Sequence, residues 1–112
     1  MQINFTDADG YKRVVLVGRM DAVGVEQIEA QFSGGVVAGG GNTIVDLAEV
    51  DFLASLGVRM LISTARALSA RGGRLVMVNA VPAVADTIEV MAFDDIVPLA
   101  ASEPDAVALL RG

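Results

Sequence analysis

The chain has 112 residues, of which 54% are hydrophobic and 20% are charged. This balance favours a folded chain over a disordered one, and the length fits one domain. No apolar run approaches the ~18 residues that a membrane span needs. The N-terminus also lacks the basic and long apolar regions of a secretory signal. We therefore expect a single domain over residues 1–112 that is cytoplasmic and has no membrane span.

The composition excludes several kinds of chemistry. The chain contains no cysteine and no histidine, so disulfides, thiolate metal sites and Ser-His-Asp or Cys-His catalysis are excluded. Eight basic and 14 acidic residues give a formal net charge of −6, which disfavours nucleic acid because phosphates repel this charge. We expect a protein that recognises a partner, is not an enzyme, and uses neither a cofactor nor a metal.

The N-terminal segment predicts a β-hairpin. Ile3 and Phe5 alternate with polar residues, residues 7–10 supply a turn, and an apolar run follows at 14–17. After Gly18 breaks this run, the chain is expected to enter its first helix.

Asp21 is well placed to cap that helix, because its carboxylate can accept hydrogen bonds from the free N–H groups of the first turn. Apolar residues then recur at helical spacing, at Val25, Ile28 and Phe32. The glycines of residues 33–35 and 39–41 predict a loose connection around residues 36–38.

A strand, a helix and a second strand are expected next. Residues 43–47 are rich in β-branched side chains and predict a buried central strand. Residues 55–70 predict a helix with one buried stripe, made of Met60, Leu61, Thr64, Ala65 and Leu68. A glycine pair ends this helix, and residues 75–78 form the next strand.

The C-terminal part predicts a helix, a short strand and a last helix. Pro82 suits a first helical turn, and the apolar residues that follow it at helical spacing are Val84, Ile88 and Met91. Residues 96–99 predict an edge strand because they contain Pro98, and Ser102 can cap a final helix. Strands separated by helices require crossover connections. The sequence therefore predicts an α/β fold, with a mixed sheet, an N-terminal hairpin, central parallel strands and helices covering one side.

Acidic residues gather after the first central strand, where α/β proteins often bind ligands. Asp46, Glu49 and Asp51 are close together in the sequence. A divalent-metal or small-ligand site is one interpretation, and an ordinary solvated loop is the other.

The charge distribution is uneven. Residues 52–85 contain four arginines and no acidic residue. Ser55, Arg59, Ser63 and Arg66 are spaced four, four and three residues apart, which places them on one face of the predicted helix. This face is either a solvated helix surface or a surface that recognises a partner.

Residues 44–59 resemble the strand, loop and helix-start motif of the STAS domain, the anti-sigma factor antagonist family. The segments at 18–21, 79–82 and 93–98 resemble further elements of that family. The resemblance implies a STAS-type fold and a bacterial partner-switching protein. In that family a kinase-type anti-sigma factor phosphorylates a serine at the helix start, and a phosphatase reverses the reaction.

The family's phosphoacceptor corresponds by position to Ser55. Ala54 replaces the motif's aspartate, and Leu56 replaces its second hydroxyl residue. A phosphate on Ser55 would be stabilised by the helix N-terminus and by Arg59 one turn along, while the alternative is that Ser55 only caps the helix. The residues expected to bind the partner are Asp21, Leu56, Gly57, Arg59, Ser63 and Arg66.

Two other functions remain open. A constitutive adaptor would dock through the same helix without phosphorylation, as STAS subunits of lipid transporters do with an ATPase. A ligand-sensing α/β domain would instead use the three acidic residues at 46, 49 and 51. A test of whether Ser55 accepts phosphate from a kinase distinguishes the adaptor from the partner-switching protein. A thermal-shift screen with ligands and metals tests the ligand-sensing domain, because a tight ligand stabilises the folded state.

Overall fold

The computed structural model describes residues 1–111, and Gly112, the last residue of the predicted domain, lies outside the described residues. Its strands are β1 (Gln2–Ala8), β2 (Tyr11–Met20), β3 (Thr43–Leu53), β4 (Leu75–Val78) and β5 (Leu99–Ala100). Its helices are α1 (Ala22–Val37), α2 (Ser55–Ser69), α3 (Pro82–Met91) and α4 (Glu103–Arg111). Within residues 1–111, no helix is both long and apolar enough to cross a membrane.

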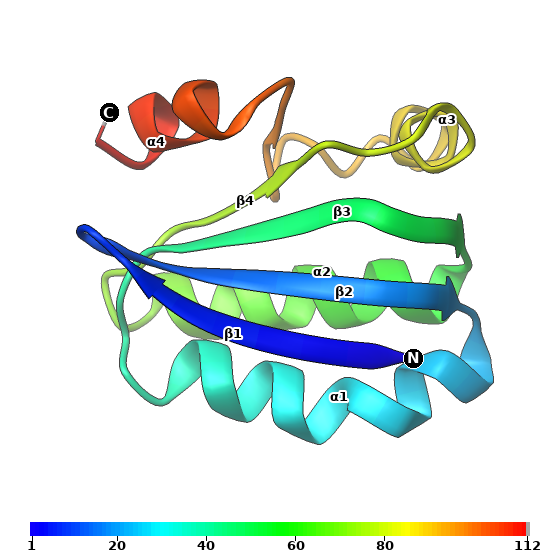
Figure 1. The fold of residues 1–112 in the computed structure, drawn as a ribbon, viewed down its shortest axis with the longest axis horizontal. Helices are drawn as coiled ribbons and strands as arrows, with labels where there is room; N and C mark the ends of the chain where they lie inside the picture. The colour runs from blue at the N-terminus through cyan, green and yellow to red at the C-terminus, as the bar shows by residue number, and fades with distance from the viewer. Residues whose placement is uncertain (112) are drawn as a thin grey trace.

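The five strands form one sheet in the order β1-β2-β3-β4-β5, and Figure 1 shows β1, β2 and β3 side by side. β1 and β2 pair antiparallel as a hairpin, and the other neighbours pair parallel. The parallel pairs are joined through helices, because the chain must travel back along the sheet before each new strand. The predicted α/β fold class, with its hairpin and central parallel strands, is confirmed.

β3 is longer than the predicted strand of residues 43–47. These five residues are buried, as expected for a central strand, but the strand continues to Leu53. Two register shifts against β2 accommodate extra β3 residues in this continuation. The polar side chains that indicate a turn in the sequence thus stay within the strand, while Val50 and Leu53 remain buried.

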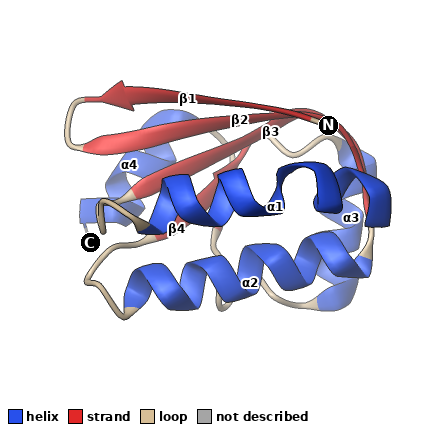
Figure 2. Ribbon diagram, turned by 90° about the horizontal axis from the view of Figure 1, so that it is seen from below, coloured by secondary structure: helices blue, strands red, loops and turns tan. Residues whose placement is uncertain are grey.

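Helices cover both faces of the sheet, as Figures 1 and 2 show. α1 and α2 pack against each other on one face and enclose the main core. α4 packs on the other face over a smaller cluster, which consists of Ile44, Val76, Val78, Ala100, Ala106 and Leu110. The prediction that helices cover only one side of the sheet is therefore incomplete, because α4 covers the second side. The central parallel strands present apolar side chains on both faces, and both faces need cover.

α1 begins as predicted and ends later. The Asp21 carboxylate accepts a hydrogen bond from the Gly24 N–H at 2.9 Å and caps the helix. The predicted break at residues 33–35 is wrong, because the helix continues to Val37. Val36 is buried and extends the apolar stripe by one turn. Gly35 sits where a Cβ atom would collide with the Phe5 ring, so this glycine allows β1 and α1 to approach closely.

The last strand is shorter than predicted. Ile96 and Val97 donate their N–H groups to the Phe93 carbonyl at 2.9 and 3.0 Å, which forms a turn in place of the predicted strand. Pairing with β4 is therefore confined to the two residues of β5. The cap of the final helix is confirmed, since the Ser102 hydroxyl accepts from the Asp105 N–H at 3.3 Å.

The neighbouring glycines of α1 should respond in opposite ways to alanine. Gly34→Ala places its Cβ in open space, so we expect the free energy of unfolding to rise by about 0.5–1 kcal/mol from improved helix propensity. Gly35→Ala displaces the Phe5 ring, and we expect a decrease of about 1 kcal/mol. Urea unfolding of the two variants measures both changes, and an equal gain at both positions would contradict the packing described.

Candidate functional site

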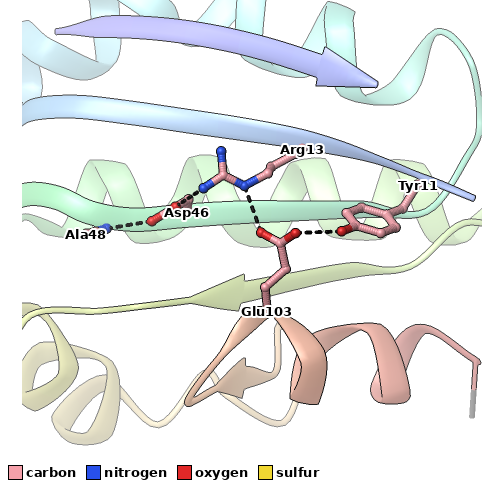
Figure 3. Close-up of polar contacts among 5 residues, drawn as sticks. All are labelled: Tyr11, Arg13, Asp46, Ala48 and Glu103. Atoms are coloured by element: carbon pink, nitrogen blue, oxygen red, sulfur yellow. Dashed lines mark hydrogen bonds and ion pairs between the residues drawn. The ribbon is translucent and has the colours of Figure 1, made fainter. Parts of the chain in front are cut away.

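The first candidate site is a polar cluster between the sheet and α4, shown in Figure 3. Asp46 is only 5% exposed, and its carboxylate accepts hydrogen bonds from the Arg13 guanidinium and from the Ala48 N–H. Arg13 also donates to Glu103 of α4 at 2.8 Å, and the Tyr11 hydroxyl donates to the other Glu103 oxygen at 2.6 Å. One guanidinium therefore bridges two carboxylates and ties α4 to β2 and β3.

These contacts shift the protonation of two groups. The hydrogen bond donated by Tyr11, followed by that of Arg13, lowers the pKa of Glu103 below its usual value. The same bond to Glu103, together with burial, raises the pKa of Tyr11. Both shifts keep Glu103 charged and Tyr11 neutral, so the Tyr11 hydroxyl donates and the carboxylate accepts in the contact that Figure 3 marks.

The acidic residues that suggested a ligand site do not converge. Asp46, Glu49 and Asp51 all lie in β3 and not in a loop after it. Asp46 is bound to Arg13, whereas Glu49 and Asp51 are exposed. Across residues 1–111 no group of three or more acidic residues is arranged to hold a metal ion. The cluster's geometry is that of a structural tie between α4 and the sheet.

The second candidate site is the start of α2. The Ala54 N–H donates to the Met20 carbonyl at 3.0 Å, which joins the beginning of this helix to the end of β2. Ala54 occupies the N-cap position and supplies no side-chain hydrogen bond. The alternative that Ser55 caps the helix is therefore wrong. Ser55 is the first helical residue and is exposed, beside backbone N–H groups that no capping side chain satisfies.

Gly57 allows the first turn of α2 to lie close to the sheet. A Cβ atom at this position would be 2.8 Å from Leu53 Cδ1 and 2.9 Å from Met20 Cγ. The residue is buried, so the structure gives it a packing role beneath the predicted partner-binding surface. Leu56, by contrast, points outward and is 41% exposed.

The outer face of α2 carries the predicted polar line. Ser55, Arg59, Ser63 and Arg66 are all exposed, and they line one groove of about 530 Å³. Val58 and Ile62 of the same helix also line this groove, as does Met91 at the end of α3. The sequence gives no sign of the Met91 contribution, because this residue is distant from α2 in the chain.

Asp21 lies at the same end of the sheet as Ser55. The residue before Asp21, Met20, accepts a hydrogen bond from the N–H of Ala54, the residue before Ser55. Its carboxylate caps α1 and pairs with Arg19 Nε at 3.1 Å. The hydrogen bond from the Gly24 N–H, and secondarily the charge of Arg19, lowers the pKa of Asp21. The Arg19 guanidinium also stacks over the Phe52 ring, with Arg19 Cζ 3.9 Å from the ring centroid. The sequence did not predict this contact.

A family model described as "Mlab, STAS domain" matches residues 3–98. The chain therefore belongs to the STAS domain family, and the predicted resemblance is confirmed. It is 29% identical over 111 residues to BtrV of Bordetella bronchiseptica, which is named as a candidate anti-sigma factor antagonist, and the match covers 99% of this chain and 96% of BtrV.

Solved structures agree with this assignment. An anti-sigma factor antagonist from Mycobacterium paratuberculosis is 30% identical with a TM-score of 0.87, over 99% of this chain and 94% of that one. Unphosphorylated SpoIIAA of Bacillus is 24% identical with a TM-score of 0.76, over 99% and 97% of the two chains. The SpoIIAA likeness shows a shared fold.

The tie between α4 and the sheet predicts a pH-dependent variant. Glu103→Gln removes the charge that Arg13 and Tyr11 contact, so we expect the free energy of unfolding at pH 7 to fall by about 1 kcal/mol. Because the folded state lowers the pKa of Glu103, its contribution is complete above the usual carboxyl pKa and is lost as pH falls through the lowered value. The difference from the parent protein should therefore shrink on acidification.

Thermal unfolding across this pH range measures the change. Glu49→Gln removes an equally negative but exposed carboxylate of β3 and serves as the matched control. A gap between Glu103→Gln and the parent that stays constant down to about pH 3 would contradict the proposed charge dependence.

Proposed function

We propose that this protein is a partner-switching regulator of the anti-sigma factor antagonist type. It binds a kinase-type anti-sigma factor through α2, and phosphorylation of Ser55 ends that binding until a phosphatase removes the phosphate. The observation that carries the proposal is the position of Ser55, exposed as the first residue of a helix without a capping side chain. The chain's membership of the STAS family and its similarity to anti-sigma factor antagonists support it.

The local electrostatics support a phosphate at this position. The free N–H groups and the dipole of a helix N-terminus favour an anion by ~0.3–1 kcal/mol at an exposed site. Arg59 lies one turn further along the same face and adds a positive charge. A phosphate brings roughly −1.5 to −2 charges at pH 7, so it would neutralise the basic surface that the partner contacts without disturbing the core.

A constitutive adaptor is the second candidate function. One observation favours it: Ala54 and Leu56 flank Ser55 where the phosphorylated family pattern has an aspartate and a hydroxyl residue. In this alternative the same face of α2 docks to an ATPase subunit, and Ser55 remains unmodified.

Substitutions of Ser55 separate these functions. Incubation of the protein with the kinase-type anti-sigma factor of its own organism and ATP should add one phosphate at Ser55, detected by mass spectrometry. Ser55→Ala should block modification and keep partner binding, because it removes only the exposed hydroxyl. Ser55→Asp should keep thermal stability and weaken binding, since an anion at this helix position is tolerated by the fold.

Ser69→Ala is the matched control, because Ser69 is an exposed serine of the same helix that lies outside the groove. It should leave phosphorylation unchanged. Absence of phosphate at Ser55 would favour the constitutive adaptor, and phosphorylation without release of the partner would contradict the proposed switch.

A further inference from the structure

The groove between α2 and α3 combines an apolar lining with a basic edge. Val58 is buried, Ile62 is half-buried and Met91 is 43% exposed, so the groove presents apolar side chains from both helices. Arg59 and Arg66 lie along its α2 side. A surface of this kind is complementary to a ligand with an apolar stripe and adjacent negative charges.

The two arginines are available to such a ligand. Within residues 1–111 the ion pairs join Arg13 to Asp46 and Glu103, and Arg19 to Asp21. Arg59 and Arg66 therefore pair with no carboxylate of the described chain. On the α2 side no acidic residue competes for these arginines, because residues 52–85 contain no acidic side chain. Asp86 and Glu89 of α3 are exposed, but neither of them lines the groove.

The length and openness of the groove favour a helix over a small molecule. Ser55 and Arg66 are 11 positions apart on α2, which corresponds to roughly 16 Å at 1.5 Å per residue. The groove is an open surface channel, in which a small molecule would remain largely in water, whereas ligand pockets bury most of their ligand. A partner helix of about three turns matches this length and can place apolar residues on one stripe.

From these contacts we infer that the groove binds an acidic amphipathic helix of a protein partner. Its apolar stripe packs on Val58, Ile62 and Met91, and its carboxylates face Arg59 and Arg66. This inference deepens the proposed function, because it states the chemistry of the partner segment that α2 recognises. It also gives Met91 of α3 a role in selecting the partner, and it puts Ser55 at one end of the bound helix.

A designed peptide tests the groove without the natural partner. The probe is a helical peptide of about 16 residues, whose central three turns match the groove and carry leucines on one stripe with glutamates beside them. Binding to the full chain, labelled with ¹⁵N, is followed by amide shifts and by isothermal titration calorimetry. We expect the shifts to centre on Arg59, Ser63, Arg66 and Met91.

Two matched peptides define the chemistry. Lysines in place of the glutamates, or serines in place of the leucines, should each weaken binding by about tenfold or more, because each removes one of the two complementary features. Binding of the lysine or serine peptide as tight as that of the probe would overturn the inference.

Variants of the chain locate the site. Met91→Ser and Arg66→Glu should each weaken probe binding by about fivefold or more, whereas Arg71→Glu, an equal charge change outside the groove, should alter it less than about twofold. Equal losses from Arg66→Glu and Arg71→Glu would show a general charge effect and overturn the assignment. Circular dichroism checks that each variant remains folded.

The outcome is separable from that of the phosphorylation experiment. Ser55→Ala should keep probe binding, and Ser55→Asp should weaken it because a negative charge then lies at the end of an acidic helix. Phosphorylation of Ser55 combined with no binding of the probe overturns the groove assignment alone. Probe binding combined with an unmodified Ser55 retains the groove and rejects the phosphorylation switch.

Discussion

The arrangement of the site depends on one backbone hydrogen bond, from the Ala54 N–H to the Met20 carbonyl. It joins the end of β2 to the beginning of α2, and the neighbouring chain turns from β3 into the helix at that point. Gly57 makes this junction possible, because a side chain there would meet Met20 and Leu53. Ser55 stands between these two contacts, so its position follows from the sheet and not from its own side chain.

α2 serves the core and the surface at the same time. Its buried stripe completes the main core with α1 and the sheet, while its outer face carries the serine and arginine line. A charge added to the outer face changes what the surface attracts and leaves the buried stripe intact. The tie of Arg13, Asp46 and Glu103 holds α4 on the opposite side of the sheet, away from this surface.

Local patterns predict the parts of the fold that local physics determines. The α2 stripe, the hairpin and the Asp21 cap follow from side-chain spacing and from short-range hydrogen bonding, and all three are present. The end of α1 and the length of β5 depend on contacts that these local patterns do not reveal. Gly35 stays within α1 and leaves room for the Phe5 ring of β1. The turn after Phe93 uses the N–H groups of Ile96 and Val97, which a longer β5 would need.

The same distinction applies to the site. The spacing of Ser55, Arg59, Ser63 and Arg66 predicts one exposed helix face, because a helix repeats every 3.6 residues. The spacing of residues along α2 carries no information on what α3 places beside that face. Met91 and the Arg19–Phe52 contact therefore emerge only when the chain is folded.

The junction at Ala54 has a consequence for how such proteins diverge. Its hydrogen bond uses only main-chain atoms, so residues 54 and 56 can change without moving Ser55. Both side chains flank the serine, and Leu56 is exposed to whatever approaches it. Duplicated copies of such a chain within one genome can therefore differ at the residues beside Ser55 while the position of the serine is inherited unchanged. Under the proposed function, mutation at these two positions offers a short evolutionary route to signalling pathways that do not cross-react.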